Sequence, residues 1–219
     1  YLRLYVKIPL VGRLGVLAST FDFVADAAPG VKEILAVGKL CWEVKERNYD
    51  LVVVDAEASG HVVSQIGAPR VIADLVQVGL VREQTQWMLD ILEDPERTGV
   101  VVTTTPEEMP VIESIELLQR LTAETGTHPA AVVANRVLPA MFDRTEQKVA
   151  RHVQDAVPVL VDAVGPGAAA VVEAASIIEA RRSIGVEHLD RLRTVVSELD
   201  PPVSAGGRSR PVPIITVPE

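Results

Sequence analysis

Apolar residues along this chain occur either at helical spacing or in short unbroken runs, and the two patterns alternate. From about Val31 to Lys45 apolar residues keep a spacing of three to four, which predicts a helix that Asn48 ends. The run Leu51–Val54 then has no polar alternation. Such a run predicts a strand buried on both faces of a parallel sheet.

Helical spacing returns between His61 and Thr98, around residues 71–76 and again around 87–92. This stretch predicts helices and no further strand. We therefore expect a helical lobe over residues 62–98.

A second buried strand is predicted over Val100–Thr104, followed by a strong helix start. Thr105 and Glu108 can form a reciprocal capping box, and Pro106 suits the first helical position, where its missing N–H costs nothing. Gly126 is expected to end this helix. One face of the helix is predicted to pack on the sheet through Met109, Ile112, Ile115, Leu118 and Leu121.

The last third of the chain predicts two more strands and two helices between them. Ala130–Ala134 reads as a strand that ends on Asn135 and Arg136, and residues 212–217 read as the final strand. Helices are expected over about 168–182 and 187–199, separated at Ile184 and Gly185. Residues 201–211 are expected to form a loop.

The alternation of strands and helices predicts an α/β fold with a mainly parallel sheet flanked by helices and connected by right-handed crossovers. The 219 residues suffice for one substantial domain over residues 1–219, and 48% hydrophobic content with 4% aromatic residues suits helices packed on such a sheet.

The net charge and the composition make some classes of binding partner and some cellular locations less expected than others. A net charge of −9 disfavours nucleic acid and anionic membranes. No apolar run approaches the ~18 residues that span a bilayer, and no signal-peptide pattern is visible. The single cysteine, Cys41, cannot form an internal disulfide. We expect a soluble cytoplasmic protein.

Asp55 follows the predicted strand Leu51–Val54 and is the first candidate site residue. Ligands of open α/β sheets bind outside the carboxyl ends of the strands, where a carboxylate can meet a phosphate-bound metal. Gly60 then leaves room for a backbone N–H to approach a phosphate. The alternatives are a capping aspartate and a glycine that a tight turn requires.

Together these segments resemble the ArsA-like, deviant-Walker P-loop ATPases, which include arsenite-pump ATPases and ATPases that target tail-anchored proteins. Asp55-Ala-Glu-Ala-Ser-Gly-His61 resembles the family's switch II. Val132-Val-Ala-Asn-Arg136 resembles the strand whose terminal Asn reads adenine. Ile214-Ile-Thr-Val-Pro218 resembles the strand that leads into the loop flanking the same base.

The resemblance implies ATP and Mg²⁺ as ligands. Asp55 would fix Mg²⁺ through a bound water, and Gly60 would be the pivot at the γ-phosphate. Asn135 and Pro218 would contact the adenine; an Asn amide suits the base edge, although it equally suits a cap at a strand end. Glu57 departs from the small residue or Pro usual in switch II, and His61 is given no proton-transfer role.

The family's Gly-Lys-Ser/Thr phosphate loop does not occur in this sequence, and neither does the acid of its switch I. We therefore expect the chain alone not to hydrolyse ATP and the ATPase to reside in the complete protein, of which this is an N-terminally truncated fragment. A non-catalytic paralogue is the competing interpretation.

The functional expectation is an ATPase subunit that couples nucleotide state to rearrangement of a homo- or hetero-dimer or of a client. A hydrophobic protein client could use a groove around Trp87–Leu92, although core packing of these residues against the sheet is the stronger interpretation. One cysteine does not suit an arsenite site. Alternatives are a non-catalytic assembly subunit and a ParA- or MinD-like positioning ATPase.

Overall fold

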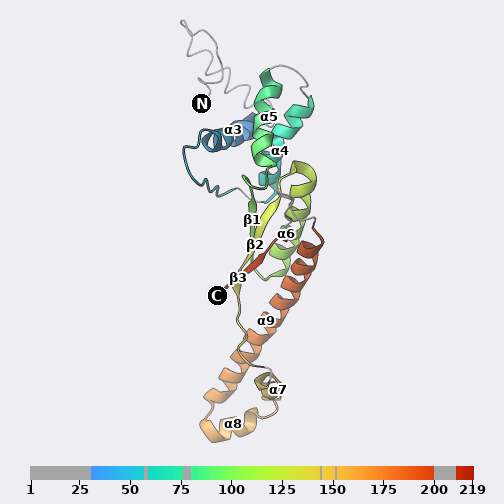
Figure 1. The fold of residues 1–219 in the computed structure, drawn as a ribbon. Coiled ribbons are helices and arrows are strands. Elements are labelled where there is room, and N and C mark those ends of the chain that lie inside the picture. The colour runs from blue at the N-terminus through green and yellow to red at the C-terminus, as the bar shows by residue number, and fades with distance from the viewer. Residues whose placement is uncertain (1–30, 57–58, 76–79, 144, 151, 200–210) are drawn as a thin grey trace. The chain divides into compact units, whose positions relative to one another are not determined.

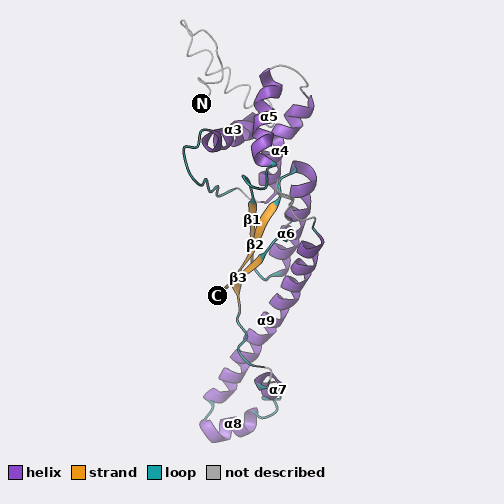
Figure 2. Ribbon diagram, viewed as in Figure 1, coloured by secondary structure: helices purple, strands orange, loops and turns teal. Residues whose placement is uncertain are grey.

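The computed structural model describes residues 31–56, 59–75, 80–143, 145–150, 152–199 and 211–219 (Figure 1). Its elements, in chain order, are α3 (Val31–Lys45), α4 (Ser59–Leu75), α5 (Leu80–Leu92), β1 (Val100–Thr104), α6 (Glu108–Arg120), η1 (Leu121–Thr125), β2 (Pro129–Val137), α7 (Glu146–Ala150), α8 (Val157–Val164), α9 (Gly167–Glu198) and β3 (Ile214–Pro218). Strands and helices are distinguished in Figure 2.

The chain divides into two compact units, which we describe separately. Of the described residues, unit 1 takes those within 31–100 and 117–129, and unit 2 takes those within 101–116, 130–199 and 211–219. The assignment of residues 1–219 to one domain stays a prediction.

Unit 1 is helical, and its core lies where α3 meets α5. Val37 and Cys41 of α3 form a buried cluster with Met88, Ile91 and Leu92 of α5. These α5 residues are therefore core residues, as predicted, but their partner is α3 where the sheet was expected. Met88, Ile91 and Leu92 are too buried to line a client groove.

A cation–π contact between Lys45 and Trp87 lies beside this cluster, against which Trp87 packs. The Lys45 Nζ at the end of α3 lies 4.6 Å from the centroid of the Trp87 ring. Such a contact stabilises the pair electrostatically.

A second set of contacts in unit 1 fixes the turn after η1. Gly126 adopts φ 70°, ends η1 as expected, and has the Arg70 guanidinium directly against the position of a β-carbon. Arg70 donates to Glu93 at 2.7 Å, and the Thr127 hydroxyl donates to the Leu92 carbonyl at 3.1 Å. Glycine is required here because its left-handed conformation leaves no room for a side chain.

The strand predicted over Leu51–Val54 is wrong. This segment forms no strand, and its side chains are exposed except for the half-buried Val52, with 77% exposure for Leu51 and 83% for Val53. A strand exists only when a neighbour takes up its backbone hydrogen bonds, and no described strand pairs with this segment. The apolar composition of the run favours a strand, but it does not tell whether another strand lies beside it.

Unit 2 contains the sheet. Its strands lie in the order β1-β2-β3, and β2 pairs with β3 in parallel, with Val132 opposite Ile214 and Ala134 opposite Thr216. Val132 and Ala134 are fully buried, whereas Ile215 is half exposed. The α/β fold class with a helix-flanked parallel sheet is confirmed.

The helix after β1 begins later than predicted. It starts at Glu108, with the Val111 N–H donating to the Glu107 carbonyl at 3.1 Å, so Pro106 precedes the helix and Thr105 is not its cap. The face assignment of Met109 is also wrong, because this side chain is 62% exposed. The buried face of α6 consists of Val111, Ser114, Ile115 and Leu118. Met109 lies two positions before Val111, which at the helical period places it on the opposite side from the buried face.

The two helices predicted after β2 are a single helix. α9 runs unbroken through Ile184 and Gly185 for 32 residues. Its second half buries a stripe at helical spacing, formed by Gly185, Leu189, Leu192 and Val196, whereas only Val172 is buried in its first half. The prediction took Gly185 for a helix break. In the structure Gly185 lies inside the helix, where its missing side chain allows α9 to approach Pro106 closely.

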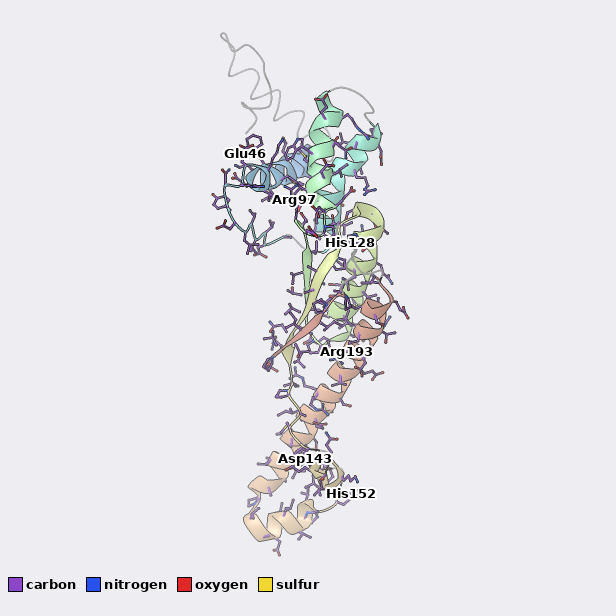
Figure 3. All side chains as sticks on the ribbon, viewed as in Figure 1. Glu46, Arg97, His128, Asp143, His152 and Arg193 are labelled. Carbon is purple, nitrogen blue, oxygen red and sulfur yellow. The ribbon has the colours of Figure 1, made fainter. Side chains whose placement is uncertain are left out.

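Between β2 and α9 the described residues form two short helices, α7 and α8. Asp143 caps α7: its carboxylate accepts from the N–H of Glu146 at 2.8 Å, and Glu146 accepts from the N–H of Asp143 at 2.8 Å. This is a reciprocal capping box. Figure 3 labels Asp143 and, just beyond α7, His152.

The sequence also predicted a loop before the last strand and no membrane-spanning segment. The loop predicted over residues 201–211 lies, apart from Pro211, outside the described residues. No helix in the described parts of the chain is both long enough and apolar enough to cross a bilayer.

Candidate functional site

A backbone irregularity marks the carboxyl end of β2. The parallel register with β3 shifts between Ala134 and Val137, so Asn135 and Arg136 are not paired in sequence with the neighbouring strand. Arg136 adopts φ 58°, an uncommon conformation for a residue with a side chain. Bulges of this kind redirect side chains and are frequent beside functional sites.

Local contacts hold this bulge in place. The Asn135 Oδ1 accepts from the Arg136 N–H at 2.9 Å, and the Arg136 guanidinium donates to the Glu219 carboxylate at 3.1 Å. The Glu219 N–H donates to the Val137 carbonyl at 3.3 Å. The ends of β2 and β3 are thus joined by side chains as well as by the backbone.

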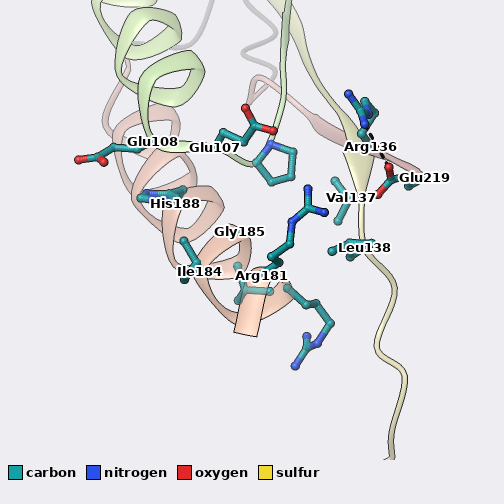
Figure 4. Close-up of a pocket in the computed structure, with 13 residues that line it drawn as sticks. Glu107, Glu108, Arg136, Val137, Leu138, Arg181, Ile184, Gly185, His188 and Glu219 are labelled. Carbon is teal, nitrogen blue, oxygen red and sulfur yellow. Dashed lines mark hydrogen bonds and ion pairs between the residues drawn. The ribbon is translucent and has the colours of Figure 1, made fainter. Parts of the chain in front are cut away.

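A pocket of about 370 Å³ opens at these strand ends, within unit 2 (Figure 4). Its volume is in the range of small-molecule sites, about 300–1,000 Å³. One wall comes from the segment after β1, a second from the end of β2 with Glu219, and a third from α9. The lining residues are Pro106, Glu107, Glu108, Arg136, Val137, Leu138, Arg181, Arg182, Ile184, Gly185, Val186, His188 and Glu219.

The cationic side chains of the pocket differ in their pairing. Arg136 is paired with Glu219, and Arg182 makes two hydrogen bonds to Glu179, at 2.6 and 2.8 Å. The hydrogen bonds from Arg182 lower the pKa of the Glu179 carboxyl, and the same bonds raise the pKa of the guanidinium. Arg181 has no hydrogen bond or ion pair to any described residue.

Two of the predicted site residues come together here. Asn135 belongs to β2 and Pro218 to β3, and Pro218 lies opposite Val137 in the register. Both are exposed and neither lines the pocket, although their neighbours Arg136 and Glu219 do. The side-chain oxygen of Asn135 makes the hydrogen bond expected of a capping residue at a strand end. Its side-chain nitrogen has no hydrogen bond to a described residue.

The other two predicted site residues lie in unit 1. Asp55 is exposed and precedes the undescribed residues 57 and 58, which include Glu57. Gly60 is not in a tight turn but in the first turn of α4, and a β-carbon there would have no atom within 4 Å. The first backbone N–H groups of a helix lack intrahelical partners and favour anions.

A magnesium ion would have to be held mainly by its ligand's oxygens. Among the described residues no three His, Cys, Asp or Glu side chains gather into a metal-binding group. Mg²⁺ usually combines one or two carboxylates with waters and substrate phosphates. The exposed carboxylate of Asp55 fits that arrangement.

The sequence interpretation missed the pocket's α9 wall and its charged rim. Arg136 and Glu219 stand directly beside the predicted Asn135 and Pro218, so the strand ends could have indicated them. Nothing in the sequence pointed to Arg181 or His188, because that requires knowing that α9 passes the strand ends.

Comparison with known proteins identifies a related family. Residues 77–162 match the family model of anion-transporting ATPases. ATPase BagA of Mycobacterium tuberculosis is 27% identical over 149 residues, which cover 65% of this chain and 43% of that protein. A protein of Entamoeba dispar named ATPase ASNA1 homolog is 23% identical over 162 residues, covering 58% of this chain and 49% of that protein. The chain therefore spans less than half the length of either relative.

Proposed function

We propose, from this similarity to ArsA-like ATPases, that the chain is a member of that family and that in the complete protein it binds ATP with Mg²⁺ and takes part in ATP hydrolysis. We further propose that the state of the nucleotide is coupled to rearrangement of a dimer or of a bound client.

The observation that carries this proposal is the pocket at the carboxyl ends of the parallel strands. Ligands of open α/β sheets bind on this side, and the pocket has the volume and the mixed aliphatic and charged lining of a small-molecule site. Asn135 and Pro218 flank it from adjacent strands. Their proposed role is recognition of the adenine, in which the Asn135 amide contacts the base edge.

Asp55 and Gly60 are proposed to act at the phosphate end. The Asp55 carboxylate would accept a hydrogen bond from a water on Mg²⁺, and Mg²⁺ would supply neutralisation of phosphate charge. Gly60, in the first turn of α4, would offer its backbone N–H to the γ-phosphate. Such chemistry works by positioning and electrostatics and needs no covalent intermediate.

A client or partner surface is proposed on α8 and the first half of α9. Both helices carry exposed aliphatic side chains, namely Val159, Val164, Val171, Ile177 and Ile178. The α8 and α9 residues pack on each other but leave these side chains in solvent. Exposed apolar groups of this kind are typical of protein interaction sites.

The central test is Mg²⁺-dependent ATP hydrolysis by the complete protein and its Asp55→Asn variant. We expect the variant to lower turnover by about a hundredfold, since a preorganised charge contact is lost. Asp50→Asn is the matched control, because Asp50 is likewise exposed and lies five positions upstream. Wild-type turnover in Asp55→Asn, or equal losses in both variants, contradicts the role of Asp55.

A further inference from the structure

The pocket beside β2 and β3 contains one cation whose charge the described protein residues leave unpaired. Arg136 is held by Glu219 and Arg182 by Glu179. Arg181 is exposed, lines the pocket from α9 and has no ion-pair partner among the described residues (Figure 4). Its guanidinium is therefore the group available to a ligand.

The rest of the lining limits what that ligand presents. The apolar lining residues are all aliphatic and offer no ring on which a flat group could stack: Pro106, Val137, Leu138, Ile184 and Val186. Of the planar side chains in the lining, Arg136 and Arg182 are held by carboxylates, which leaves the Arg181 guanidinium and the His188 imidazole. A guanidinium stacks on aromatic rings as well as pairing with anions.

The carboxylates of the pocket decide between a ring and a phosphate chain. Glu107 and Glu108 line the same pocket and are exposed, and Glu219 lines it as well. Arg136 neutralises Glu219, but Glu107 and Glu108 have no ion pair with a described residue. A polyphosphate in this space would therefore meet two uncompensated carboxylates against the single free guanidinium of Arg181, whereas an uncharged heteroaromatic ring would not be repelled. The lining therefore favours the base end of a nucleotide over its phosphate end.

We propose that Arg181 covers one face of the nucleobase and is the residue that fixes the base in this pocket. This inference rests on the proposed function and adds a binding residue from α9 to the strand-end residues Asn135 and Pro218. The guanidinium contributes by its plane as well as by its charge.

The test compares the affinities of AMP, ADP and ATP for the complete protein by titration calorimetry, in the wild type and in Arg181→Gln and Arg181→Lys. We expect Arg181→Gln to weaken all three nucleotides by a similar factor, about five- to tenfold. Arg181→Lys should lose most of the same affinity, because it keeps the charge but not the planar group.

The control is Arg191→Gln, which removes an exposed arginine from the same helix outside the pocket. It should leave the three affinities unchanged, and circular dichroism should show equal helix content in all variants. Wild-type affinities in Arg181→Gln overturn the inference while leaving nucleotide binding intact. A loss that grows with the number of phosphates, or full retention in Arg181→Lys, also overturns it, since either places Arg181 at the phosphates. A wild type that binds none of the nucleotides contradicts the proposed function itself.

Discussion

Gly185 of α9 approaches Pro106 so closely that a β-carbon at position 185 would lie 3.1 Å from the Pro106 Cβ and 3.2 Å from the Pro106 carbonyl oxygen. Pro106 follows β1, and both residues line the strand-end pocket. The contact therefore sets the distance between α9 and the segment after β1, and with it the width of the pocket.

Gly185→Val is expected to lower the free energy of unfolding by about 2 kcal/mol, because the added atoms meet backbone and a rigid ring that cannot move aside. Gly167→Val is the matched control at the start of the same helix, where a β-carbon has no atom within 4 Å. It should change the free energy by less than about 0.5 kcal/mol. Denaturant unfolding followed by circular dichroism measures both; equal effects would show that the contact with Pro106 is not tight.

Replacement of Asn135 separates its two roles. Asn135→Ala should lower the preference for ATP over GTP by roughly 1 to 3 kcal/mol, because a buried base edge loses its partner. Asn135→Asp keeps an oxygen to accept from the Arg136 N–H, as Asn135 does at 2.9 Å, but cannot donate to the base. If Asn135 only caps the strand end, the Asp variant will bind both nucleotides like the wild type. Competition binding to the complete protein measures the preference.

Gly60→Ala tests the proposed phosphate contact without disturbing the fold. The added methyl group meets no atom within 4 Å, and alanine favours the helix that Gly60 helps to begin. Stability should be unchanged or slightly higher, while ATP turnover by the complete protein should fall if the backbone approaches the γ-phosphate closely. Undiminished turnover would return Gly60 to a purely structural position.

The thiol of Cys41 predicts a specific dependence of stability on pH. Burial raises its pKa from 9.0 to about 12, with a smaller opposing effect of Arg97. The unfolded chain releases this proton above pH 9 while the folded chain retains it, so stability falls as the pH rises from 9 towards 12. Between pH 8.5 and 10 the wild type should lose about 1 kcal/mol more than Cys41→Ala.

Unfolding by urea, followed by tryptophan fluorescence, measures this difference. Both tryptophans of the chain, Trp42 and Trp87, lie in α3 and α5 of unit 1, as does Cys41. Parallel pH profiles for the two proteins would contradict the assignment.

The sequence sufficed for elements whose signals are local. The periodicity of α3 and the apolar runs of β1, β2 and β3 identified these elements, because burial on one or both faces imposes a pattern on composition. Gly126 was found for a similar reason, since a left-handed helix end selects glycine within a few residues.

The failures share a dependence on residues far away in the chain. The strand at Leu51–Val54 needed a paired neighbour, and the supposed break at Gly185 was a close approach to Pro106, which lies 79 positions earlier. The pocket depended on the same approach, since Arg181 reaches the strand ends only because α9 continues unbroken. Of the candidate site, the strand-end residues could be anticipated and the helix wall could not.

The continuity of α9 has a mechanical consequence. From Gly185 back to Gly167 the helix advances about 27 Å at its regular rise, and it carries α8 at that distant end. Pivoting by about 10° at the contact with Pro106 would therefore swing the apolar tip by about 5 Å. A small change in the width of the pocket would therefore displace any protein that is bound to α8 and the first turns of α9.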